Sequence, residues 1–190
     1  LYLKRKYSIE LVRQGKLEEA ESHLFEIVKK QKYSDESTAL LLGGVQTALD
    51  KQAESQSTYK ATLKAHPSSE ESCIFLAKTM GTKENFKGAH ALLRSCEKVN
   101  KEKGIFSYYR GKLFLKEKKS TTAMKFFRRS VELEKRFYQG AMAIGLMYEE
   151  SKKVDKAIAV YKNFLKDSPQ SYPILSRLVQ VMFTHEKYQE

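Results

Sequence analysis

The sequence predicts an all-α protein, a right-handed α-solenoid of antiparallel helix pairs. Apolar residues recur at helical spacing through long windows, and the 190 residues include only 9 glycines and 3 prolines, with no alternating strand pattern. Small residues also recur in phase every 34 residues, at Gly43, Ala77, Gly111 and Gly145. A fixed period of this length is typical of stacked helical units that bury a continuous core against their neighbours.

A second series of positions keeps the same period. It consists of small residues, Ala157, Ala123, Ala89 and Ser55, and after one extra residue Ala20. The residue four positions after each of them is bulky: Leu24, Tyr59, Leu93, Phe127 and Tyr161. Because small and bulky residues stay in phase through five copies, we interpret the chain as repeats of one unit.

The first unit is expected to hold helices at Leu1–Gln14 and Leu17–Lys30, with Gly15 as the break between them. Ser34 or Asp35 is placed to cap the next helix. The next first helix carries Gly43-Gly44, a pair that costs on the order of 1 kcal/mol per glycine in a helix interior and therefore indicates close packing by another helix.

The later units follow with local variations. Ser68 and Glu71 have the spacing of a capping box at the start of the third unit. In the fourth, Arg110 stands where the pattern calls for a bulky apolar residue. A sixth first helix is expected at Tyr172–His185, with Pro173 at an N-terminal position that suits it.

The clearest unit is Tyr138–Ser171, which joins two amphipathic patterns through a polar stretch at Ser151–Val154. Its key positions, Ile144-Gly145, Tyr148, Ala157, Tyr161 and Pro169, closely follow the order L-G-x2-Y, A-x3-F, P on a 34-residue period. The sequence therefore resembles the tetratricopeptide repeat family over nearly its whole length.

The resemblance implies one array over 1-190 with about five and a half repeats, at 1-35, 36-69, 70-103, 104-137, 138-171 and, in part, 172-190. The chain begins with Leu1 rather than Met, and Tyr188-Gln189-Glu190 resembles the opening of a second helix. We therefore expect a piece of a longer array. The compartment is left open.

The net charge is +12, and 10 of the 35 basic residues fall in Gly104–Phe137 against 3 acidic ones. A basic block of this kind attracts acidic proteins, nucleic acid or anionic lipid. A solvated lysine-rich surface is the simpler interpretation. The longest apolar stretch, around Ala39–Val45, is too short to span a bilayer.

No catalytic, cofactor or metal site is predicted. The four histidines are scattered without metal-ligand spacing, and the acid pairs Glu18-Glu19 and Glu149-Glu150 are interpreted as solvated helix residues. Cys73 and Cys96 fall in one repeat, where antiparallel helices can bring them together. Two buried thiols and a disulfide, which would imply an oxidising compartment, both stay open.

The resemblance further implies that the first helices line a groove that binds a peptide or protein. Its positions are apolar and aromatic with a basic side, which suits a segment with apolar anchors and acidic residues. Each aliphatic member is equally well explained as packing between repeats. The groove residues are Leu40, Leu41, Ile74, Phe75, Lys78, Tyr108, Tyr109, Lys112, Lys116, Met142 and Leu146.

Some members of the family bind acidic C-terminal tails of chaperones through a Lys/Asn two-carboxylate clamp. Arg5 and Ile9 stand at the corresponding first-repeat positions, so the clamp is not supported.

Three functions are therefore weighed. The first is a noncatalytic scaffold or adaptor for protein–protein interaction. The second is nucleic-acid binding through the basic fourth repeat and Tyr108-Tyr109, by base stacking and phosphate contacts. The third is an array that recruits substrates to an enzyme domain outside this segment. We expect the first, with no cofactor, and do not expect nucleic acid to be the partner.

Overall fold

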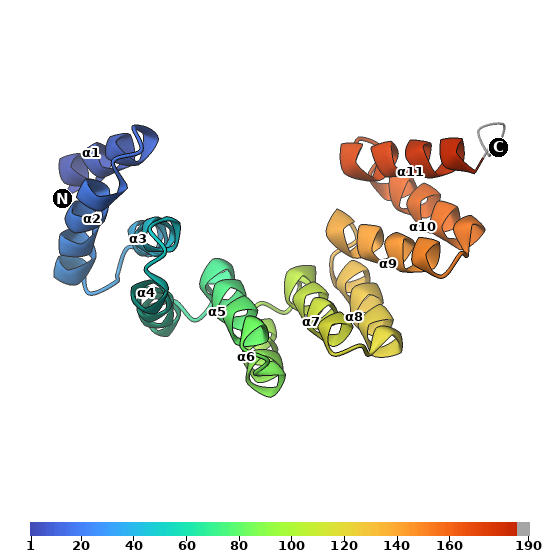
Figure 1. The fold of residues 1–190 in the computed structure, drawn as a ribbon, viewed down its shortest axis with the longest axis horizontal. Helices are drawn as coiled ribbons and strands as arrows, with labels where there is room; N and C mark the ends of the chain where they lie inside the picture. The colour runs from blue at the N-terminus through green and yellow to red at the C-terminus, as the bar shows by residue number, and fades with distance from the viewer. Residues whose placement is uncertain (186–190) are drawn as a thin grey trace. The chain divides into compact units, whose positions relative to one another are not determined.

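The computed structural model describes residues 1–185, and over these residues the chain is all α-helical, with eleven helices and no strand (Figure 1). The prediction of an all-α solenoid of helix pairs is confirmed. The expected opening of a second helix at Tyr188–Glu190 lies outside the described residues. The helices are α1 (Tyr2–Arg13), α2 (Leu17–Gln31), α3 (Glu36–Ala48), α4 (Gln52–Ala65), α5 (Glu70–Thr82), α6 (Phe86–Val99), α7 (Gly104–Lys116), α8 (Ser120–Leu133), α9 (Tyr138–Glu150), α10 (Val154–Asp167) and α11 (Tyr172–Thr184).

The helix lengths and joins explain the 34-residue period. From α3 to α10, first helices of 13 residues alternate with second helices of 14 residues. Joins of three residues connect the helices of a pair, and joins of four residues connect one pair to the next. Such short joins leave consecutive helices antiparallel and in contact.

One backbone motif makes the three-residue joins alike. The residue after each first helix's cap has a left-handed conformation at Gly15, Asp50, Glu84, Lys118 and Lys152, with φ between 56° and 75°. The next residue donates its backbone N–H to a carbonyl five residues earlier, as from Lys119 N to Phe114 O at 2.8 Å and from Lys153 N to Tyr148 O at 2.8 Å. This is the pattern of a Schellman motif, which satisfies the last carbonyls of a helix and reverses the chain.

The helix starts follow the predicted signals in part. Asp35 is the N-cap of α3 and accepts a hydrogen bond from the backbone N–H of Thr38 at 3.3 Å, as expected. Pro173 stands in the first turn of α11, also as expected. The predicted capping box of Ser68 and Glu71 is wrong. Because α5 begins at Glu70, Ser69 occupies the N-cap position, and its hydroxyl donates to Ser72.

The described chain divides into two compact units, Leu1–Leu92 and Leu93–Glu190. In the first unit, consecutive helices from α1 to α5 pack on one another in chain order. One apolar cluster of this unit joins buried side chains of α2 and α3: Leu24, Val28, Ala39, Leu42 and Val45. This part of the core therefore lies at the junction between the first pair and the second.

In the second unit, α7 to α11 pack in the same consecutive order, and α9 also contacts the first helices on either side, α7 and α11. One apolar cluster joins Ala123 and Phe127 of α8 to Ile144 of α9. A larger one joins α9, α10 and α11 around Tyr161 and Phe164. On α11, Ile174, Leu178 and Val181 are buried, whereas Val179 and Phe183 are exposed.

Glycines of the first helices contact aromatic rings of the second helices. A Cβ at Gly43 would lie 2.9 Å from Tyr59, one at Gly111 would lie 2.6 Å from Phe127, and one at Gly145 would lie 2.1 Å from Tyr161. In each pair the ring is 16 residues after the glycine. The small and the bulky series seen in the sequence are therefore the two sides of one contact.

The neighbouring glycines of α3 give a stability test. Gly43→Ala should destabilise the protein by about 1–3 kcal/mol because its methyl group meets the buried Tyr59 ring. Gly44→Ala should stabilise it by about 0.5–1 kcal/mol, since nothing lies within 4 Å of its Cβ and alanine favours a helix. Urea unfolding followed by circular dichroism measures both. Effects of the same sign would contradict the close-contact interpretation.

The left-handed join residues give a second test. Lys118→Gly should raise the free energy of unfolding by about 0.5–1 kcal/mol, because glycine adopts φ near 60° without the cost that a Cβ imposes. Lys116→Gly, two residues earlier and inside α7, should lower it by about 1 kcal/mol. Thermal and urea unfolding of the two variants should therefore shift in opposite directions. Loss of stability in both would show that the left-handed position carries no strain.

Candidate functional site

The predicted groove residues of α3 line an apolar hollow in the first unit. Leu40 and Leu41 border a cavity of about 480 Å³ with Val12, Gly44 and Val45. Both leucines are half-buried, so their side chains are reachable from this cavity. Glu71 of α5 supplies an acidic group at its edge.

The predicted groove residues of α5 differ in exposure. Lys78 is exposed and Ile74 is half-buried. The Phe75 ring stacks on Tyr59, with ring centroids 4.0 Å apart and an angle of 25° between the planes. Burial, reinforced by Glu71, raises the pKa of Tyr59 to about 12. Phe75 therefore packs within the fold, and its role toward a partner stays a prediction.

In the second unit the structure brings together Tyr108, Tyr109 and Lys112 of α7. The two tyrosine rings meet edge to face at a centroid distance of 5.3 Å. The Lys112 ammonium lies 5.7 Å from the centroid of each ring. An ammonium within about 6 Å of an aromatic centroid is attracted by the ring face. Lys116, one turn further along α7, is exposed.

Tyr108 and Tyr109 are not equivalent. Tyr108 also contacts the rings of Phe127 and Phe137, at centroid distances of 5.7 Å and 5.6 Å. Burial, followed by the neighbouring Tyr109 and Tyr138, raises the pKa of the Tyr108 hydroxyl. Tyr108 is thus held in the fold by more ring contacts than Tyr109, although both tyrosines are half-buried, and Lys112 is the exposed member of this group.

The predicted groove residues of α9 also lie in the second unit. Met142 is half-buried and packs against the cluster around Tyr161, whereas Leu146 is exposed. Because α9 contacts α7, an exposed apolar side chain on α9 lies on the helix next to the Tyr109–Lys112 pair. The two helices together present apolar, aromatic and cationic groups.

Sequence reasoning marked Arg110 as a departure but missed what it contacts. Its side chain is buried, donates to Glu97 Oε2 at 3.3 Å, and lies with its guanidinium carbon 4.1 Å from the centroid of Phe126. Ser107 and Arg129 donate to the other Glu97 oxygen at 2.8 Å and 3.1 Å. Burial lowers the pKa of Arg110, and Glu97 opposes this shift. Glu97 is thus the centre of a partly buried ionic cluster joining α6, α7 and α8.

The interpretation of Glu149 as a solvated residue is wrong. Its carboxylate accepts hydrogen bonds from Tyr161 Oη at 2.7 Å and from Arg177 Nε at 3.2 Å, and Arg177 Nη2 bonds its second oxygen. The bond to Glu149 is the main cause of the raised pKa of Arg177, and burial is the main cause of the raised pKa of Tyr161. Glu149 therefore ties α9 to α10 and α11. Nothing in the sequence marks this contact, because Glu149 and Arg177 are 28 residues apart.

Other expectations concern the clamp position, the cysteines and metal binding. Arg5 donates to Thr38 Oγ1 and Ser37 Oγ, each at 2.8 Å, so its guanidinium is held by the start of α3. Cys73 and Cys96 are both buried, and neither is a free thiol.

Among residues 1–185 no cluster of three or more His, Cys, Asp or Glu has an arrangement suited to a metal ion. Within the same range no helix is long and apolar enough to cross a membrane.

The Glu97 cluster gives a prediction. Glu97→Gln should destabilise the protein by about 3–5 kcal/mol, because it leaves the buried Arg110 without its counter-charge. Glu26→Gln, which breaks the exposed pair with Lys4, is the matched control and should change stability far less. Urea unfolding in low salt compares the two. Equal losses of stability in the two variants would show that the buried ion pairs of Glu97 contribute no more to stability than the exposed pair of Glu26.

Comparison with known proteins bears on the repeat and on the fold. Residues 141–171 match the family model of the tetratricopeptide repeat. No curated protein matches the chain. The sequence match therefore covers a single repeat, the one whose key positions follow the pattern most closely.

Solved structures match over almost the whole chain. A tetratricopeptide repeat protein from Parabacteroides merdae is 16% identical with a TM-score of 0.67, covering 98% of this chain and 73% of its own. A thermophilic TPR protein of Thermus thermophilus is 16% identical with a TM-score of 0.66, covering 96% and 98%. YrrB, described as a TPR protein with an unusual peptide-binding site, is 14% identical with a TM-score of 0.53, covering 87% and 84%. At these identities the likeness is one of fold.

Proposed function

We propose that this chain is a noncatalytic scaffold that holds a peptide or protein segment on the side formed by its first helices. The proposal is supported by the match of residues 141–171 to the tetratricopeptide repeat and by the fold shared with tetratricopeptide repeat proteins. The fold is typical of protein-interaction scaffolds. We also propose that 1–190 forms one array. A solved neighbour with this fold, YrrB, is itself described by its peptide-binding site.

The observation that carries the proposal is the grouping of Tyr109 and Lys112 on α7 beside the exposed Leu146 of α9. An aromatic ring supplies a large contact area at low entropy cost, and an adjacent cation adds charge recognition. In the first unit, the cavity lined by Leu40 and Leu41 supports an apolar anchor in the same way. These groups suit a segment that combines apolar and acidic side chains.

The charge distribution supports an acidic partner for the second unit in particular. Residues 93–190 hold 21 of the 35 lysines and arginines against 11 of the 23 acidic residues. Complementary charge speeds the encounter of two partners and selects among them more than it adds affinity. We therefore assign Lys112 and Lys116 to recognition of acidic side chains and the neighbouring tyrosine to the apolar anchor.

Nucleic-acid binding is the weaker candidate. Base stacking needs an accessible ring face, and both tyrosines are half-buried, with Tyr108 also in contact with Phe127 and Phe137. Neither ring of the pair is fully exposed for that purpose. An array that recruits substrates to a separate enzyme domain would use the same surface and is a special case of the scaffold.

The test uses a fluorescently labelled short peptide of glutamates with leucine and phenylalanine anchors, and its binding is read by anisotropy. Lys112→Glu with Lys116→Glu should weaken binding by about tenfold, since both charges are reversed beside the anchor site. Lys29→Glu with Lys30→Glu makes the same change in net charge on exposed positions of α2 and should have little effect.

Equal losses in the two double variants would show that only the net charge matters and would contradict a local site. The nucleic-acid alternative is checked with labelled single-stranded RNA at two salt concentrations. RNA binding that persists at physiological salt and is lost in Tyr109→Ala would favour that alternative over the scaffold.

A further inference from the structure

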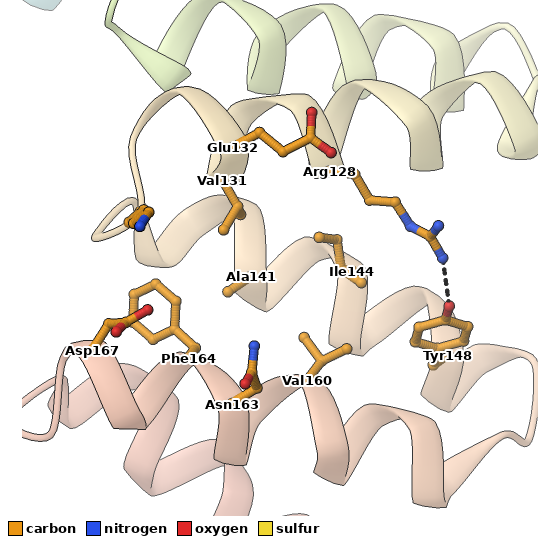
Figure 2. Close-up of a pocket in the computed structure, with 11 residues that line it drawn as sticks. Arg128, Val131, Glu132, Ala141, Ile144, Tyr148, Val160, Asn163, Phe164 and Asp167 are labelled. Atoms are coloured by element: carbon orange, nitrogen blue, oxygen red, sulfur yellow. Dashed lines mark hydrogen bonds between the residues drawn. The ribbon is translucent and has the colours of Figure 1, made fainter.

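A second hollow in the second unit lies among α8, α9 and α10, and none of the predicted groove residues lines it (Figure 2). Its volume is about 460 Å³, within the range of about 300–1,000 Å³ that is usual for ligand sites. Its apolar lining includes Val131 of α8, Ala141 and Ile144 of α9, and Val160 and Phe164 of α10. Figure 2 shows these side chains around one space between the helices.

The preceding repeat junction shows what can fill such a space. The residues of the Glu97 cluster, Glu97, Ser107, Arg110, Phe126 and Arg129, lie 34 residues before Val131, Ala141, Ile144, Val160 and Asn163. All five of these counterparts line the hollow. The hollow and the ionic cluster therefore occupy equivalent places in two successive repeats.

At the earlier junction, the space is taken by the long Arg110 side chain and the Phe126 ring, which stack at 4.1 Å. At the later one, Ile144 and Val160 are shorter, and the volume stays open. The counterpart of Glu97 is Val131, so the position that carries the buried carboxylate at the earlier junction is apolar here, and the two carboxylates of the lining, Glu132 and Asp167, belong to exposed residues. The chemistry of the lining therefore favours an apolar or aromatic guest side chain.

The surroundings of the hollow add a charge preference. Over residues 120–136 and 154–167, seven exposed residues are cationic and three are acidic, and one of the cations, Arg129, pairs with Glu97. The lining of the hollow itself holds two cations, Arg128 and Lys135, and two carboxylates, Glu132 and Asp167, so the excess of positive charge lies in the surface around it. Arg128 also donates to Tyr148 Oη at 2.8 Å. Residues that flank the guest side chain should therefore be acidic.

We propose that the hollow among α8, α9 and α10 is a second docking site, which takes one bulky apolar or aromatic side chain from an acidic segment of a protein partner. The guest occupies the volume that Arg110 and Phe126 fill one repeat earlier. Because Tyr109, Lys112 and Lys116 are not part of its lining, the site is separate from the first-helix surface assigned above. A scaffold with both sites would hold two segments at once.

The chain contains no tryptophan, so tryptophan in a probe peptide reports on the peptide alone. The probe is a short peptide with one central tryptophan flanked by glutamates, added to the intact chain. Entry into the apolar hollow should shift its emission to shorter wavelength. A peptide with lysines in place of the glutamates should bind at least about tenfold more weakly.

Val160→Phe is the main variant, because phenylalanine stands at the equivalent position 126 and stacks there on Phe114 at 5.1 Å. Tyr148 is the counterpart of Phe114, so a ring at position 160 should be accommodated while it fills the hollow. Binding should fall by about tenfold or more at unchanged helical content. Lys135→Glu, on the exposed rim, should weaken binding without altering the core. All variants are compared in a Tyr109→Ala background, so that the first-helix surface does not contribute to the signal.

Undiminished binding to a folded Val160→Phe variant would overturn the proposal, as would equal binding of the lysine-flanked peptide or no emission shift at any peptide concentration. If Val160→Phe does not fold, Lys135→Glu decides, and unchanged binding there overturns the proposal. Self-association of the chain that Lys135→Glu or Val160→Phe abolishes would assign the hollow to a second copy and reject the acidic partner. Loss of binding in Tyr109→Ala would instead place the peptide on the first-helix surface.

Discussion

The contact between a small residue on a first helix and a ring on the second helix sets the spacing of the helix pairs. Gly43, Gly111 and Gly145 each lie against an aromatic ring 16 residues later, at distances that leave no room for a methyl group. Because the helices can approach this closely, a three-residue join is enough to connect them, and the same join recurs along the chain. The 34-residue period follows from that geometry, and in the second unit α9 contacts the first helices on either side of it.

The second unit shows how one scaffold produces different chemistry at equivalent places. The junction around Glu97 is closed by an arginine, a carboxylate and a phenylalanine, while the next junction has valines and an isoleucine and stays open. Neither change disturbs the glycine contacts beside it, since Gly111 and Gly145 both keep their rings. Interaction sites can therefore vary between helix pairs while the contacts that stack the helices stay fixed.

The fold could be predicted from the sequence because the pattern of small and bulky residues repeats. The assignment of each position to a helix is therefore supported by the equivalent positions in the other repeats. Individual contacts had no such support. Spacing alone does not distinguish Tyr108, which is anchored between Phe127 and Phe137, from Tyr109 beside it. The partner of Arg110 lies 13 residues away on another helix, so only the folded arrangement reveals it. The junction among α8, α9 and α10 is open because its side chains are smaller than those of the equivalent junction one repeat earlier. A search for features that all repeats share does not detect such a difference.

The first repeat is one residue longer than the others, and the structure shows where the extra residue is absorbed. Helix α2 has 15 residues where the later second helices have 14, and it is followed by Lys32 and Tyr33, both with positive φ. The following helix still starts in phase with its own neighbours. The architecture therefore tolerates an added residue at the C-terminal end of a second helix, where residues with positive φ absorb it. The same exits are natural points at which to insert a peptide tag or graft a loop without shifting the register of the units beyond.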